Sequence, residues 1–506
     1  MARAKSIISR VADWIRNGGA RAPAQRGYEG GRRNRHTDGW LSGASSADGQ
    51  IIPAAALLRE RMRDLVRNNP HAAMAVQVLV NNMVGSGIRP RAKTGNAAMN
   101  KKVDRLWEAW ARRADAHGHS DVYGVMALAV REMIEGGDCF ALPHFGAQLG
   151  TGIPPLQIEL READHLDTGK NGGVSGGGEI RDGIEYNSKG QRVAVWMFDH
   201  HPGDVRAFRK IGESRRVPVD RMAHLFERQR VQSRGVPWAA PSLIDLRHFD
   251  DWRNTELIRK KTEACLAGVI MSEDDPAGVS GEGAALGARL TDSEGNTVEE
   301  FTPGMIASVR GGTDFKTVQP QATGGVGEWS RVQLHAVAAG MRVPYCLMTG
   351  DLKENNFASS RVGLNEFRRM VEMIQWTCII PMLLEPIWAW FIQAAQLAGL
   401  LPDRGDYVAE WAPPRFESVN PKQDVEADIA EVRAGFASPQ MMIAKRGYDP
   451  EAVLAEWAAW AKRTDTAGVV FDSDPRRVAK GGNAQPEQPS DDGEAAPTQD
   501  PPEAGA

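Results

Sequence analysis

The chain has 506 residues, which is more than one simple hydrophobic core usually holds, so about two or three folding units are expected. Its 42% hydrophobic and 25% charged residues are typical of a globular protein. The formal net charge of −4 argues against a nucleic-acid clamp, because tight non-specific DNA binding needs clustered lysine and arginine.

The beginning of the chain favours neither a signal peptide nor a membrane anchor. Apolar residues of the first 15 positions have helical spacing, but Arg10 and Asp13 interrupt them. No stretch approaches the roughly 20 apolar residues that cross a bilayer, so a soluble protein is expected. The four cysteines are widely spaced, which predicts reduced side chains in a cytosolic protein. They are Cys139, Cys265, Cys346 and Cys378.

Residues 1–49 are predicted to form a flexible basic arm, which is either solvated or a docking or DNA-contacting segment. Residues 53–84 have a helical apolar pattern, and Pro70 predicts a break in it. Residues 155–230 change to short β-rich runs separated by turns such as "NSKGQ". Within that region, "GKNGGVSGGGE" is predicted to be an exposed glycine-rich loop.

A long helix is predicted from about Pro241, because proline suits the first position of a helix. Its expected buried side is formed by Leu243, Leu246, Phe249, Trp252, Leu257 and Cys265. Turn-rich residues 271–325 contain short β-like runs, and a helix at about 327–342 then returns. A polar loop around Lys353 follows, and a second long helix from about Ser359 contains Pro381 and Pro386, which predict a kink.

The last part of the chain divides into a helical module and an acidic end. Turn and cap signals such as Asn420-Pro421 place a small helical module at 415–465. From residue 466 the chain becomes polar, and the stretch "AQPEQPSDDGEAAPTQDPPEAGA" is acidic and proline-rich without lysine or arginine. This composition predicts disorder.

Patterns that indicate catalysis or metal binding are weak. "GVSGG" matches Gly-x-Ser-x-Gly at Ser175, but a nucleophile elbow needs an apolar strand before it and a helix after it, and neither is indicated. His117, His119, His200 and His201 form no set with zinc-ligand spacing. We therefore expect no catalytic residue, no cofactor and no metal, and a protein that is not an enzyme.

Several stretches in this order resemble the portal proteins of tailed bacteriophages, specifically the lambda-like portal family, over roughly residues 25–465. They are "GIEYNSKGQRVAVWMF", "HLFERQRVQSRGVPWAAPSLIDLRHFDDW", "FTPGMIASV" and "AAGMRVPYCLMTGDLKENNFASSRVGLNEFRR". The resemblance implies an α+β, mainly helical portal fold. It has a wing, stem helices, a small β-rich clip, a tunnel loop and a helical crown, and it is assembled as a ring.

The same resemblance implies a division of the chain into the parts of that fold. The implied parts are the arm (1–49), wing (50–236), stem helix (237–270), clip (271–326), second stem helix (327–348), tunnel loop (349–361), kinked wing helix and return (362–414), crown (415–465) and disordered acidic tail (466–506).

The function implied is a ring of about twelve subunits at one capsid vertex, through which double-stranded DNA is packaged and ejected. Implied partners are other copies of the chain, the terminase large subunit, major capsid and scaffold proteins, head-completion or connector proteins, and the passing DNA, with no membrane. The virion portal vertex is the implied location, with the host cytoplasm during assembly. Lys353, Asn355 and Asn356 would contact DNA from the tunnel loop. Arg247, Arg253 and Lys260 of the stem would either face the channel or bond a neighbouring subunit.

Two alternatives from other classes stay open. One is a structural head or adaptor protein without a DNA channel. The other is a phage-encoded hydrolase that uses Ser175 or the histidines.

Overall fold

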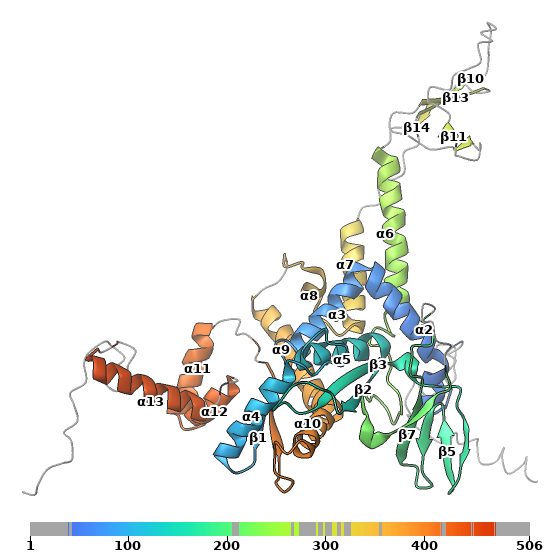
Figure 1. Ribbon diagram of the computed structural model, residues 1–506. Coiled ribbons are helices and arrows are strands. Elements are labelled where there is room, and N and C mark those ends of the chain that lie inside the picture. Colours follow the sequence, from blue (N-terminus) through green and yellow to red (C-terminus); the bar gives the residue numbers. More distant parts are fainter. Residues whose placement is uncertain are drawn as a thin grey trace, which may run out of the picture. The chain divides into compact units, whose positions relative to one another are not determined.

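The computed structural model has a mixed α+β architecture in which helices predominate (Figure 1). The chain divides into two compact units, residues 1–50 and residues 51–506, and the second is described below. The structure describes residues 39, 43–204, 212–264, 268–272, 290–291, 297–298, 306–310, 315–317, 325–353, 357–414, 416, 421–446, 448, 450–469 and 471.

Most helices begin at a proline or at a capping side chain. The helices are α2 (Ala47–Asn68), α3 (Pro70–Met83), α4 (Ala97–Ala111), α5 (Val122–Gly136), α6 (Leu243–Ala264), α7 (Val326–Gly340), α8 (Tyr345–Thr349), α9 (Phe357–Ile374), α10 (Glu385–Leu397), α11 (Pro421–Arg433), α12 (Pro439–Lys445) and α13 (Pro450–Ala467). The break predicted at Pro70 is confirmed: the side chain of Asn69 caps α3 by accepting from the backbone N–H of His71 at 2.9 Å.

A three-stranded antiparallel sheet organises the centre of the second unit. Its order is β3 (Leu156–Glu162), β2 (Asp138–Phe145), β9 (Ala223–Phe226). It packs against α5, α10 and the π-helical segment η4 (Gln375–Leu384). Buried Trp110 joins α4 to this sheet, because its indole N–H donates to the carbonyl of Leu156 at 2.7 Å.

A five-stranded antiparallel sheet forms the other part of the predicted β-rich region. Its strands are β4 (Gly172–Val174), β5 (Gly178–Arg181), β6 (Ile184–Tyr186), β7 (Arg192–Met197) and β8 (Arg215–Pro218). The turn predicted at "NSKGQ" is confirmed, and it connects the antiparallel strands β6 and β7. The prediction of a glycine-rich loop at "GKNGGVSGGGE" is wrong, because β4 and β5 pair there. Gly176 and Gly177 have φ values of +94° and +81°, so they supply the turn of this hairpin.

The described residues of the stretch between α6 and α7 form short strands, as predicted. β10 (Gly268–Ser272) pairs in parallel with β13 (Ile306–Arg310) and antiparallel with β14 (Phe315–Thr317). β11 (Leu290–Thr291) pairs with β12 (Thr297–Val298). The last sheet pairs β1 (Arg89–Lys93) with β15 (Val408–Ala412).

The continuous helical run from Arg361 to Leu397 consists of most of α9 together with η4 and α10. It is long and apolar enough to span a membrane by length and composition, so the expectation that no such stretch exists is wrong. However, 67% of its most apolar window is buried inside the protein, which is typical of a core helix. Pro381 lies inside the π-helical segment, where the regular α-helical hydrogen-bond pattern is already changed.

Candidate nucleic-acid interface

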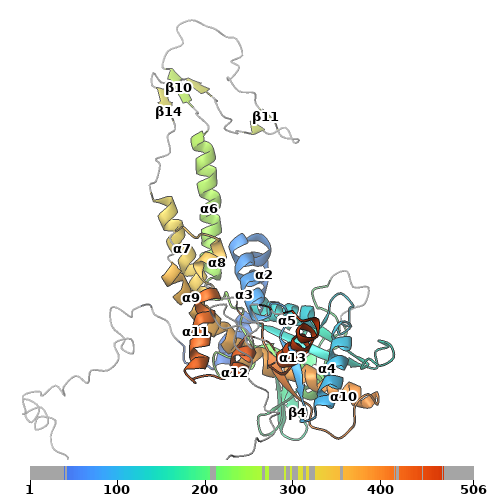
Figure 2. The ribbon, with the colours of Figure 1, turned by 90° about the vertical axis from the view of Figure 1, so that its left-hand side faces the viewer.

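Helices α6 and α7 lie side by side in both ribbon views (Figures 1 and 2), and their contact is mainly aromatic. The rings of Trp252 and Trp329 are 4.2 Å apart, and Phe249 of α6 is 5% exposed. Phe249 also meets His71 of α3 edge-on at 5.8 Å. These contacts fix the lower part of α6 to both α7 and α3. The α-helical bounds are shorter than the predicted stem segments, because residues 268–272 form β10 and α7 ends at Gly340.

Gly340 allows the closest approach between the end of α7 and the start of α6. A Cβ atom at this position would lie 1.7 Å from the Oγ atom of Ser242 and 3.1 Å from its Cβ atom. Ser242 is 2% exposed, and its hydroxyl donates to the carbonyl of Val337 at 3.4 Å. Only glycine therefore fits at position 340 without displacing this junction.

The charged side chains of α6 are balanced. The helix carries five acidic and five basic residues, with Asp245 in its first turn and Lys261 in its last, as the helix dipole favours. Of the predicted stem cations, Arg247 pairs with Asp251 at 3.3 Å and Arg253 with Asp250 at 2.7 Å, while Lys260 is exposed. Both pairs lie within one helix; the Arg247–Asp251 pair is exposed and contributes only about 0.3–0.5 kcal/mol, while the Arg253–Asp250 pair is partly buried.

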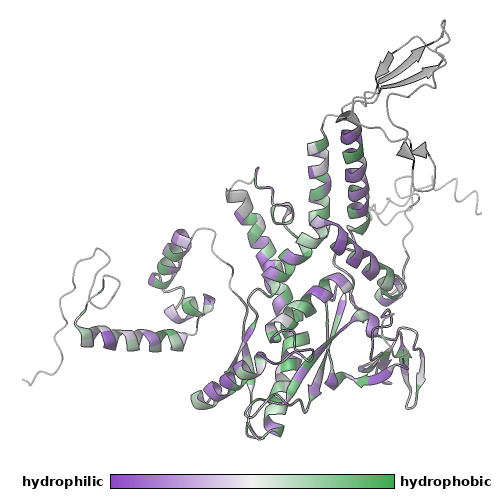
Figure 3. Cartoon of the chain, turned by 45° about the horizontal axis from the view of Figure 1, so that its top comes forward, coloured by the Kyte–Doolittle hydropathy of each residue, from purple (hydrophilic) through white to green (hydrophobic). Residues whose placement is uncertain are grey.

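The α6–α7 pair also exposes apolar side chains, and Figure 3 shows hydrophobic residues among the hydrophilic ones along both helices. Ile244 and Val332 are each 63% exposed, and Leu257 is 53% exposed. The prediction that Leu257 is buried is wrong. Trp252 of α6 packs on Trp329 of α7, and Leu257 lies more than one helical turn beyond Trp252. α7 starts only three residues before Trp329, so it does not extend far enough to cover Leu257.

Arg342 fixes the direction of the chain after α7. Its backbone has φ of +60°, a conformation that is uncommon for a residue with a side chain. The guanidinium donates to both carboxylate oxygens of Glu227, at 2.8 and 2.9 Å, and lies 4.6 Å from the centre of the Trp238 ring. The strained turn is therefore held by an ion pair and a cation–π contact with the segment after β9.

The polar loop around Lys353 begins with residues that hydrogen bonds and packing hold in place; these residues are called the loop base. α8 ends at Thr349 and is capped by Gly350, whose φ of +73° is left-handed. Asp351 accepts from the backbone N–H of Lys353 at 3.1 Å and from the hydroxyl of Tyr345 at 3.4 Å. Burial, and then the carboxylate of Asp351, raise the pKa of the Tyr345 hydroxyl. Tyr345 in turn stacks on His335 of α7 at 4.0 Å.

Lys353 itself is exposed at the end of this anchored base. Asn355 and Asn356 lie outside the described residues. The helix expected from about Ser359 begins at Phe357, inside the segment 349–361 that the resemblance implies as the tunnel loop. The sequence alone indicated Lys353 as a candidate site residue. It did not indicate Asp351, Tyr345 or Arg342, which position the loop base. The only local signal for them was Gly350 after a short helical stretch.

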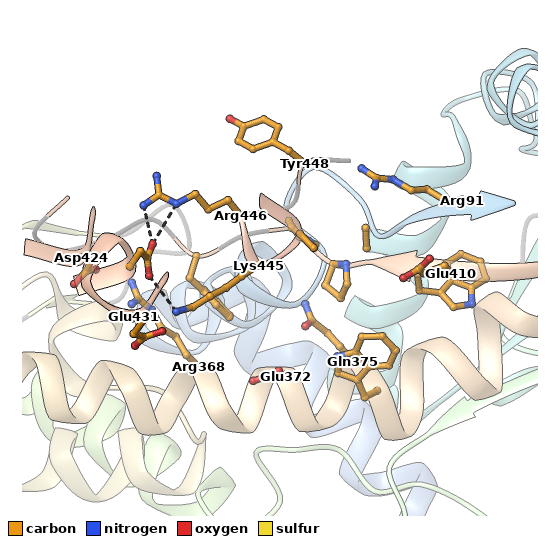
Figure 4. Close-up of a pocket in the computed structure, with 18 of the residues that line it drawn as sticks. Arg91, Arg368, Glu372, Gln375, Glu410, Asp424, Glu431, Lys445, Arg446 and Tyr448 are labelled. Carbon is orange, nitrogen blue, oxygen red and sulfur yellow. Dashed lines mark hydrogen bonds and ion pairs between the residues drawn. The ribbon is translucent and has the colours of Figure 1, made fainter. Parts of the chain in front are cut away.

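A pocket of about 760 Å³ lies between α9, β15, α11 and α12 (Figure 4). Lys445 and Arg446 point to one carboxylate in it, that of Asp428, at 3.2 and 2.7 Å. The hydrogen bond from Arg446 holds the pKa of Asp428 below its usual value. Lys445 and Arg446 of the α12 segment neutralise Asp428 of α11, so these three side chains connect two helices rather than form a catalytic centre.

The structure also tests the alternative catalytic and metal sites. Ser175 is exposed in the turn between β4 and β5, not at a strand–helix junction. His201 approaches Glu162 at 3.5 Å and Asp164 at 3.8 Å, a grouping that the sequence did not reveal. Arg63 already binds both carboxylates at 2.7 Å, so a guanidinium supplies the positive charge that a metal ion would bring.

A buried polar network ties β2 to β9. The carboxylate of Asp138, which is 1% exposed, binds the Nε2 atom of His224 at 3.0 Å and the Nε atom of Arg234 at 2.6 Å. Although burial opposes it, Arg234 and His224 hold the pKa of Asp138 well below its usual range. Burial lowers the pKa of His224 to about 4. A neutral ring fits the geometry, because Arg192 donates to the Nδ1 atom at 2.6 Å and that atom must therefore accept.

Comparison with known proteins gives one matching family and several relatives. Residues 33–375 match the model of the family described as phage portal protein, lambda family. The probable portal protein of Halomonas phage phiHAP-1 is 25% identical over 464 residues, which cover 88% of each chain. Portal protein B of Escherichia phage lambda is 21% identical over 499 residues, which cover 88% of this chain and 91% of the relative. Among solved structures, a chain from the neck of an empty gene transfer agent particle aligns with a TM-score of 0.44 and 16% identity, covering 77% of this chain and 93% of that one.

Proposed function

Because the chain belongs to the lambda family of phage portal proteins, we propose that its copies close into a ring around a channel for double-stranded DNA. The protein is a structural component of the phage particle, not an enzyme. The observation that carries the ring is the α6–α7 pair, which exposes Ile244, Leu257 and Val332 in a single chain. A ring of about twelve copies would bury such residues against the next subunit, because a closed head-to-tail interface repeats the same contact around an axis.

Within this ring, α6 and α7 are the stem helices and the loop after α8 is the tunnel loop. Lys353 would contact phosphates of the passing duplex, with Asn355 and Asn356 as neighbouring hydrogen-bonding groups. The balanced charge of α6 supports movement rather than retention of DNA. A channel that released many counterions at each contact would bind the duplex tightly and stall it. The intrahelical partners of Arg247 and Arg253 reduce their attraction for phosphate, so both are better suited to subunit contacts than to gripping DNA.

The remaining parts take the roles that the family resemblance implies. The β segment between α6 and α7 is the clip, which would dock the terminase large subunit during packaging and head-completion or connector proteins afterwards. The sheets around β2 and β7 belong to the wing, and α11–α13 to the crown. Capsid and scaffold proteins would meet the wing from outside the channel.

The tunnel-loop role is tested by deleting residues 352–357. We expect rings to form and packaging or retention of DNA to fall, because the stem contacts through Trp252 and Trp329 remain. Lys353→Ala should give a weaker defect of the same kind. Lys189→Ala, at an exposed lysine of the β6–β7 turn, is the matched control and should package normally. Rings that package normally after the deletion, or that no longer form, would contradict a simple tunnel-loop role.

A further inference from the structure

The exposed face of α4 carries positive charge that its surroundings do not neutralise. Lys101, Lys102 and Arg105 of α4, and Arg112 directly after its end, are all exposed, and none forms an ion pair with a carboxylate among the described residues. By contrast, Arg63, Arg161 and Arg216 of the same unit each bind at least one carboxylate. The opposite side of α4 is anchored by Val103, Trp107 and Trp110, which are buried. The charged face is therefore held on a rigid helix.

This face contains a shallow groove with cations on its rim and an apolar floor. The groove has a volume of about 560 Å³. Lys101, Lys102 and Arg105 line it together with Ala98, Leu106 and Ala109. Such a surface suits a ligand that carries carboxylates at intervals along a partly apolar backbone. It suits a DNA duplex less well, because phosphates gain nothing from the apolar floor. Glu108, which is also exposed on this helix, would repel either anionic ligand.

The chain itself contains a segment with that chemistry. Residues 484–506 include six acidic residues and five prolines, and no lysine or arginine. Proline-rich segments favour an extended helix whose rings pack on apolar surfaces at a low entropic cost. The last described residue is Phe471, and the 12 residues that join it to residue 484 can span up to about 40 Å when extended.

We propose that the acidic segment 484–506 binds the α4 groove of its own chain. Its carboxylates face Lys101, Lys102 and Arg105, and its prolines cover the floor formed by Ala98, Leu106 and Ala109. The contact is electrostatic and exposed, so it weakens as salt increases. This inference does not depend on the ring or on the channel, because both groups belong to one chain.

The test compares chemical acetylation of lysines in the full chain and in a chain that ends at Asn483, read by mass spectrometry. Because exposed ion pairs are individually weak, we expect Lys101 and Lys102 to react only about threefold faster in the shortened chain. The difference should disappear in about 0.5 M NaCl, where the Debye length is roughly 4 Å. Lys189 is the internal control and should react equally in both chains. Adding a synthetic peptide of residues 484–506 to the shortened chain should restore the protection.

A variant of the full chain keeps the test independent of truncation. Replacing Asp491 and Asp492 with asparagine should accelerate the acetylation of Lys101 and Lys102 while leaving the chain length unchanged. Equal labelling of Lys101 and Lys102 in the full and shortened chains would overturn the proposal. Protection by added duplex DNA but not by the peptide would assign the groove to nucleic acid instead. Protection that is lost when the protein is diluted would show that the segment comes from another copy, which also overturns binding within one chain.

Discussion

Gly340 is a single residue on which the junction of α6 and α7 depends. Gly340→Ala would bring a methyl group against Ser242, so we expect a loss of about 1–3 kcal/mol in the free energy of unfolding of the unassembled chain. Ser242→Ala removes the Oγ atom that lies nearest, so the double variant should recover part of the loss.

Gly363→Ala in α9 is the matched control for this substitution. A Cβ atom there meets nothing within 4 Å, so helix propensity alone should leave stability unchanged or raise it by up to about 1 kcal/mol. Urea unfolding of the variants measures both effects. A Gly340→Ala chain as stable as the parent would contradict the close packing at this junction.

The buried His224 makes stability depend on pH. Its pKa is lowered to about 4 in the folded chain, whereas an exposed histidine titrates near 6.5. Between these values the unfolded chain binds a proton that the folded chain does not, so stability is lost as pH falls from about 6.5 towards 4, by up to about 3 kcal/mol. Asp138 adds to the loss at lower pH, since its pKa is held below the usual range.

His224→Gln should make this dependence weaker. The glutamine amide can donate to Asp138 and accept from Arg192 without titrating, so it preserves the two hydrogen bonds. We expect the thermal midpoint of the variant to fall less than that of the parent when pH is lowered from about 7 to 4.5. Parallel pH profiles would show that His224 does not cause the loss.

Local sequence signals predicted where Lys353 lies, and its contact with DNA stays a prediction. Lys353 stood out as the cation of a polar loop between two apolar helices, and the structure places it exposed at the end of an anchored base. The contacts of Arg342 with Glu227 and of Arg63 with Asp164 join residues that are 115 and 101 positions apart. No local pattern encodes such pairs, because only the packed fold brings their side chains together.

Among the elements, α6 and α7 carry the prediction that concerns assembly. Ile244→Asp places an acidic residue in the first turn of α6, where the helix dipole tolerates it, so the single chain should stay folded. Burying that charge against a neighbour is costly, so we expect fewer rings, by at least about tenfold for a penalty of 1.4 kcal/mol. Asn254→Asp, at an exposed polar position of the same helix, is the control and should assemble normally. Unchanged ring formation by Ile244→Asp in a native mass measurement would remove this side chain from the interface.

The bounds of the elements were predictable where prolines and caps mark them. Pro70, Pro421 and Pro450 each begin a helix, as the turn signals around them indicated. The β4–β5 hairpin was missed, because its glycines resemble a loop and its short strands are stabilised by pairing with β6 rather than by their own composition. The long helical run was recognised, but the π-helical form around Pro381 was not, since it depends on packing in the core.

At the scale of the whole molecule, the order of elements carried more information than any motif. The quoted stretches, in the order of an α+β region, a long helix, a β excursion, a returning helix and a polar loop, resemble the portal family, whose model residues 33–375 match. Ser175 lies in the turn between β4 and β5, where a nucleophile elbow does not occur. The limits of the implied parts remain predictions, because a single chain does not contain the contacts between subunits.

Copies of this chain are proposed to form a ring around a channel. The most direct measurement is electron microscopy of the purified protein in negative stain, together with its mass under assembly conditions that include scaffold protein and high concentration. We predict rings of about twelve subunits with a central opening that admits a duplex roughly 20 Å wide. A monomer or dimer that persists under those conditions, or a closed assembly without an opening, would contradict the channel.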